Sequence, residues 1–212
     1  MYRLGHMIDN QWVEHSYPPV FVVAPVGEGQ RVVAGVPGSD PQVLLSLLGC
    51  LAEPLVLLFV LHTPRDESQA GRYWSPQLSR EDVQDFIYDF KPLLCGDSRF
   101  DLWVHSPEQP ATVVWDRHNL IYGYGPLEDY ATALRALGFG HGEPQLPVPH
   151  THHYHPQLDD LCRQLLTHFD WQHSPLRPED EQLWCNQAHS CSVNLLNSVQ
   201  ASSNCCLENS AR

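Results

Sequence analysis

The order of apolar and polar residues predicts several strands along the chain. Short β-branched runs at residues 20–24 and 31–36, separated by Gly-Glu-Gly, predict a hairpin. Residues 55–61 are apolar without alternation, which is typical of a strand covered on both faces. Short connections join three further strands, and this predicts an antiparallel meander. The three strands are residues 100–105, 112–115 and 119–124.

Apolar residues at spacings of three and four predict four helices, at residues 41–51, 79–94, 126–137 and 156–169. Ser79 begins the clearest of them, and Asp82 three residues later completes a variant of the capping box. Pro92 predicts a kink or an early end, because proline lacks the amide hydrogen that a helix interior uses. Residues 63–76 are polar and rich in helix breakers, and they predict a loop.

These elements predict an α+β fold with a mostly antiparallel or mixed sheet of about five or six strands and three or four helices packed on it. We expect one globular domain at residues 1–170 and a poorly ordered Cys/Ser/Asn-rich tail at residues 171–212. Residues 43–61 approach the length of a membrane span. Pro54 breaks a helix there, so this segment predicts a buried helix running into a buried strand.

The net charge of the chain limits which classes of macromolecule it is expected to bind. The chain has 25 acidic and 12 basic residues and a formal net charge of −13, which repels nucleic-acid phosphates and allows a basic protein partner. The N-terminus lacks the apolar core of a signal peptide. The chain has seven cysteines, and an odd number does not complete a disulfide framework. From these two features we expect a cytoplasmic protein. Lys91 is the single lysine, which favours a GC-rich, bacterial coding sequence.

Histidines crowd one short segment before the last helix. In an extended chain two of them point to one side and two to the other, so a metal site on either side needs ligands from elsewhere. Neutral imidazoles are good ligands for zinc, which is the cofactor we expect if the cluster binds metal. Alternatively, the rings pack a loop before the helix. The four histidines are His150, His152, His153 and His155, and the further donors are His105, His118, Asp116, Asp159 and Asp160.

Neither the histidine segment nor the rest of the sequence matches a known catalytic motif. Its spacing resembles the His-x-His-x-Asp-His signature of metallo-β-lactamase-like hydrolases, but Tyr154 stands where that family has Asp, so we do not assign the chain to it. The chain has no Gly-x-Ser-x-Gly nucleophile elbow. A phosphate-binding P-loop is excluded too, because Lys91 follows Phe90 instead of a glycine. The sequence therefore specifies no reaction.

A second group of residues suggests a docking surface for a basic protein. Three aspartates on the helix that follows Ser79 lie opposite its apolar stripe, and four aromatic residues of the meander are placed to share one face. Alternatively, the aspartates form a solvated helix face and the aromatic residues pack under helices. The residues are Asp82, Asp85, Asp89, Trp103, Trp115, Tyr122 and Tyr124.

Two hypotheses for function follow. The first is a non-enzymatic, macromolecule-binding protein, similar in size and charge to immunity proteins that neutralise basic toxins. The second is a metal-dependent enzyme or metal-binding protein that uses the histidine cluster at residues 150–155. A cleft with convergent ligands favours the second hypothesis, and an exposed acidic and aromatic face favours the first.

Overall fold

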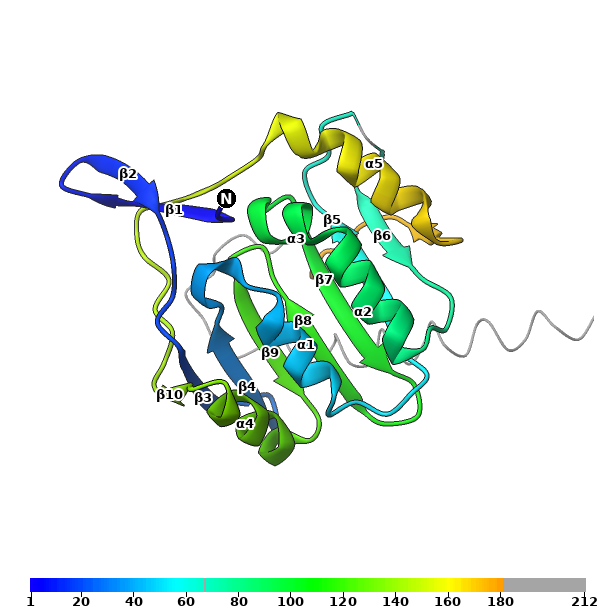
Figure 1. Cartoon of the computed structure of the whole chain (residues 1–212), viewed down its shortest axis with the longest axis horizontal. Helices are drawn as coiled ribbons and strands as arrows, with labels where there is room; N and C mark the ends of the chain where they lie inside the picture. The colour runs from blue at the N-terminus through cyan, green and yellow to red at the C-terminus, as the bar shows by residue number, and fades with distance from the viewer. Residues whose placement is uncertain (67, 181–212) are drawn as a thin grey trace, which may run out of the picture.

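A large sheet forms the centre of the computed structural model, which describes residues 1–66 and 68–180. Its strands are β3 (Val20–Val26), β4 (Gly29–Gly35), β5 (Val56–Leu61), β6 (Gly71–Trp74), β7 (Phe100–Ser106), β8 (Ala111–Trp115), β9 (Leu120–Tyr124), β10 (Gly140–His141) and β12 (Gln172–Ser174). Their order is β10-β3-β4-β9-β8-β7-β5-β6-β12 (Figure 1). All neighbours are antiparallel except β10 and β3, which run parallel. Short turns join consecutive neighbours such as β3 and β4 or β8 and β9, whereas β4 and β9 pair strands that are far apart in the chain.

A second, three-stranded sheet stands beside the large one. It consists of β1 (Leu4–Ile8), β2 (Gln11–Glu14) and β11 (His150–His152), with β1 in the middle. Asp9 and Asn10 connect β1 to β2 with φ of 49° and 62°, the left-handed conformation that a two-residue hairpin turn requires. This hairpin projects away from the large sheet in Figure 1. The small sheet thus pairs the start of the chain with residues near position 150.

Helices cover one face of the large sheet. They are α1 (Gln42–Leu48), α2 (Arg80–Asp89), α3 (Lys91–Gly96), α4 (Leu127–Ala136) and α5 (Asp159–His168) (Figure 1). Their apolar sides pack on alternate residues of the strands, such as Phe59, Val104 and Val113, to form the main core. Ser79 and Asp82 form the predicted capping box, and Pro92 lies in the first turn of α3, where the chain begins a second helix after α2.

The opposite face of the large sheet carries a smaller apolar cluster. Leu58 and Val60 of β5 pack there with Trp103, and Leu176 covers part of this group. β5 is therefore covered on both faces, as its continuous apolar sequence predicts. Arg72 on β6 is fully buried and pairs with Asp180, with 2.7 Å between Nη1 and Oδ1.

Comparison with the sequence confirms the α+β class and a mostly antiparallel sheet. Within the described residues the strands number nine plus three instead of five or six, because short strands such as β1, β2 and β11 carry no long apolar run. Residues 63–76, predicted as a loop, contain β6. Residues 43–61 divide into α1 and β5 as predicted, and none of the described helices has the length and apolar character to cross a membrane.

The C-terminal part of the described chain continues past residue 170. β12 pairs with β6 in antiparallel register, and Asp180 lies buried against Arg72. The large sheet therefore gains its outer strand from residues that the sequence pattern assigns to the tail. The rest of the predicted tail, residues 181–212, lies outside the described residues.

Candidate metal centre

Three histidine side chains converge between the two sheets. His150 and His152 are alternate residues of β11 and share one face of the small sheet. His118 comes from the turn between β8 and β9. One ring nitrogen from each of the three lies within 4.8 Å of the others. The ring centroid of His118 is 5.7 Å from that of His150 and 5.0 Å from that of His152.

Hydrogen bonds hold the turn that carries His118. Asp116 accepts from the backbone of Leu120 at 2.8 Å through Oδ1 and from the His118 ring at 3.0 Å through Oδ2. Asn119 has a φ of 60°, and its side chain accepts from Trp115 Nε1 and donates to Val36 O. These hydrogen bonds therefore fix the backbone at His118 relative to the core.

Strand pairing and one buried arginine position the side chains of His150 and His152. His150 pairs with His6 on β1, and His152 pairs with Leu4. Arg3, next to Leu4, is fully buried and donates to Asp97 O and Phe100 O, both at 2.9 Å. Its guanidinium carbon lies 4.8 Å from the ring centroid of Trp115. Arg3 thus anchors the small sheet to the large one beside the turn of His118.

The hydrogen bonds of His118 and His150 show which ring nitrogen carries the hydrogen and which one is open to a cation. Asp116 and the carbonyl of Pro147 can only accept, so Nδ1 of His118 and Nδ1 of His150 donate the hydrogen. In the neutral ring the lone pair then resides on Nε2, so Nε2 is the nitrogen available to a cation. A carboxylate behind a metal-binding histidine is the usual partner that fixes its tautomer and orientation.

The electrostatic environment keeps two of the three rings neutral. Burial, with smaller contributions from His118 and His150, lowers the pKa of His152 to about 3. Burial and His118 also lower the pKa of His150. Burial and the charge of Arg117 lower the pKa of His118, but the charge and hydrogen bond of Asp116 outweigh them, so that this pKa is raised. A cation at this site would therefore compete with a proton mainly at His118.

The spacing of the three ring nitrogens is compatible with a bound zinc ion. A tetrahedral zinc ion with bonds of about 2.0–2.1 Å holds its ligand nitrogens about 3.3–3.4 Å apart. The three rings, with nitrogens at most 4.8 Å apart, need to close by no more than about 1.5 Å to reach that spacing. In addition, Nδ1 of His152 is buried and has no hydrogen-bond partner among the described residues. A buried nitrogen of this kind is satisfied by a water or an ion.

The remaining predicted ligands lie elsewhere. His153 and His155 point to the opposite side of the segment, where Nδ1 of His153 lies 2.8 Å from Tyr2 O and the backbone of His155 donates to Asp97. His105 contacts Ala111 O and the hydroxyl of Thr112. Asp159 forms an ion pair with Arg99, and Asp160 with Arg163. The structure therefore brings together two of the four clustered histidines, with His118 as their third member.

Two further histidines belong to the same face, and sequence reasoning missed them. His6 is opposite His150 in the register of the small sheet, and its ring centroid lies 4.9 Å from that of His15. Burial, followed by the charges of His6 and His150, lowers the pKa of His15. The sequence offered little signal for His6, because the hairpin of β1 and β2 was not predicted. Without that hairpin, nothing placed His6 beside His150 or His15.

Residues of the predicted docking surface do not gather on one face. Asp82, Asp85 and Asp89 are exposed on α2. Trp115 is fully buried in the main core, on the helix-covered side of the sheet. On the other side Trp103 and Tyr124 are buried and Tyr122 is half-buried.

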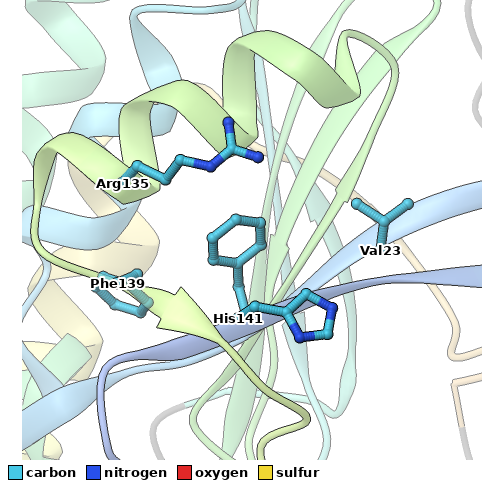
Figure 2. Close-up of a pocket in the computed structure, with 5 residues that line it drawn as sticks. Val23, Arg135, Phe139 and His141 are labelled. Carbon is cyan, nitrogen blue, oxygen red and sulfur yellow. The ribbon is translucent and has the colours of Figure 1, made fainter.

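A separate hollow lies at the far edge of the large sheet. Phe21, Val23, Arg135, Phe139 and His141 line a cavity of about 350 Å³ between β3, α4 and β10. Figure 2 shows the side chain of Arg135 extending from α4 above the ring of a phenylalanine on the strand side, with His141 at the rim. No member of the histidine triad contributes to this cavity.

No protein-family model, curated protein or solved structure matches this chain.

Proposed function

We propose that this chain binds a divalent transition-metal ion, with zinc as the expected ion, through His118, His150 and His152. The observation that carries the proposal is the convergence of three ring nitrogens within 4.8 Å, with Asp116 hydrogen-bonded behind one of the rings. Imidazole ligands suit zinc, copper, iron and nickel, and hydrogen bonds at Nδ1 orient the rings of His118 and His150.

Three protein ligands leave a fourth position on a tetrahedral ion. Structural zinc sites fill all four positions with side chains, whereas catalytic sites use three and keep one open for water or substrate. Zinc in such a site lowers the pKa of its bound water to about 7, which would supply a hydroxide for hydrolysis. The donor set therefore favours an accessible metal that reacts with or holds a small ligand.

The docking hypothesis has less support. Its aspartates are solvent-exposed on α2, but Asp82 already accepts hydrogen bonds from Ser79 in the capping box. Trp115 and Trp103 are both buried and lie on opposite sides of the sheet. Exposed aromatic anchors are what a docking surface needs.

Zinc binding by the full chain tests the proposal. The metal-free protein is titrated with Zn²⁺ against a chromophoric chelator, and bound zinc is counted by elemental analysis. We expect tight binding that falls at least about 100-fold in His118→Ala and in His152→Ala, because each variant removes one of three ligands. Circular dichroism of each variant checks that the fold is retained.

A matched pair of controls separates this site from the cluster seen in the sequence. His153→Ala removes a histidine that is adjacent in sequence but points to the other side, and His141→Ala removes an exposed one at the distant cavity. Both variants are expected to bind zinc as the unaltered chain does. Equal losses in His153→Ala and His152→Ala, or tight binding that survives in His118→Ala, would rule out the proposed triad.

A further inference from the structure

We propose that His6 and His15 form a second, weaker metal-binding position next to the triad. This inference rests on the proposed function of the triad only in that the two sites share one face of the small sheet. It makes the centre a chain of five imidazoles instead of a group of three. The ligand class is the same, a borderline transition-metal cation such as Zn²⁺ or Cu²⁺.

The register of the small sheet places these residues side by side. His6 on β1 is the cross-strand partner of His150 on β11, and its other neighbour in register is Val13 on β2. Directly opposed residues point to the same face and have Cβ atoms about 4.5–5.5 Å apart. His6 and His150 therefore adjoin on one face, and His15, two residues after Val13, continues the row on that face.

The rings of His6 and His15 contact each other, as two ligands of one cation would. Their centroids are 4.9 Å apart, with the rings nearly perpendicular at 81°. On its other side the ring of His15 packs edge-on against Tyr17, with centroids 4.5 Å apart. Tyr17 in turn donates its hydroxyl hydrogen to the backbone carbonyl of His118 at 3.1 Å. Tyr17 therefore links the position of His15 to the turn that carries the triad's first ligand.

Two buried ring nitrogens support a ligand position at this pair. Nδ1 of His6 and Nε2 of His15 are buried, and neither has a hydrogen-bond partner within residues 1–66 and 68–180. Buried polar atoms in folded proteins are almost always paired with protein, water or an ion. Because the two rings are in edge-on contact, we infer that one cation can bind between them, with water filling its remaining positions.

Ligand number sets the order of affinity. The triad offers three protein nitrogens and a supporting carboxylate, whereas the second position offers two nitrogens. A cation in the triad also repels a second cation nearby. We therefore expect the ion at His6 and His15 to bind at least about tenfold more weakly, and to be the ion that exchanges first.

Stoichiometry measured on the full chain tests this inference. Metal-free protein is titrated with Zn²⁺ by calorimetry, and bound metal is measured after equilibrium dialysis at several free Zn²⁺ concentrations. We expect two equivalents with separate affinities. The double variant His6→Gln, His15→Gln should lose the weaker equivalent and keep the tighter one. A second double variant, His6→Gln with His15→Phe, preserves the packing of an aromatic ring against Tyr17 and should give the same result.

The reciprocal variant keeps the two sites distinguishable. His118→Ala with His152→Ala is expected to lose the tighter equivalent and retain a weak one, whereas His141→Ala should retain both. Loss of the tight ion alone in this variant, with no weak ion in any protein, would contradict the second position and leave the triad standing. A weak equivalent that persists when His6 and His15 are both replaced would also contradict it.

Discussion

Asp116 holds both the turn between β8 and β9 and the ring of His118. One carboxylate oxygen holds the turn through Leu120, and the other holds the ring of His118. The first contact holds the turn, and the second orients the ring that we propose as a metal ligand. An amide at this position can preserve the first contact, but it cannot provide the charge that makes the imidazole a stronger ligand.

Asp116→Asn should lower the affinity for Zn²⁺ by about 10–100-fold, the usual effect of removing such a supporting carboxylate. The measurement is the same chelator competition, with the free energy of unfolding of the metal-free protein as its companion. Asp85→Asn on the exposed face of α2 is the matched control and should leave the affinity unchanged. An Asp116→Asn variant with full affinity would show that the carboxylate does not support the metal ligand.

Among the elements, β12 depends on a glycine in the strand beside it. A side chain at Gly71 would place its Cβ against the ring of His173 and 2.7 Å from the carbonyl oxygen of Ser174, both on β12. A backbone atom cannot rotate away as a flexible side chain does. Gly140 lies at the opposite edge of the same sheet, and a Cβ there would meet nothing within 4 Å.

Gly71→Ala should therefore displace β12 and lower the free energy of unfolding by about 1–3 kcal/mol, the usual cost of overpacking. Chemical denaturation measures the loss, and hydrogen exchange at residues 172–174 locates it. Gly140→Ala, the matched control, should stay within about 0.5 kcal/mol of the unaltered chain. Equal stability of the two variants would mean that β12 does not rest against Gly71.

On the scale of the whole molecule, the proposed metal would join the two sheets, which the buried side chain of Arg3 also links. His118 belongs to the large sheet, and His150 and His152 belong to the small one. An ion bound to all three is present only when the two sheets are docked. Metal binding therefore adds to the stability of the docked state by mass action.

Zn²⁺ at 100 times its dissociation constant should raise the free energy of unfolding by about 2.7 kcal/mol at pH 8. The gain should shrink as the pH falls, because the pKa of His118 is raised and its protonated ring cannot bind a cation. Thermal unfolding with Zn²⁺ and with a chelator, at pH 8 and pH 5.5, measures both effects. A gain that does not change between these pH values would exclude histidine as the ligand.

Local periodicity determined much of this protein. The capping box of Ser79, the division of residues 43–61 into α1 and β5, and the opposite directions of His152 and His153 all depend on neighbours in sequence. The tertiary structure alone decided that His118 completes the triad, that Trp115 is buried in the core, and that His6 lies beside His150. These outcomes depend on strand register and on the buried contacts of Arg3, which join residues far apart in the chain. No local pattern of apolar and polar residues encodes such contacts, because their free energy appears only when both partners are already in place.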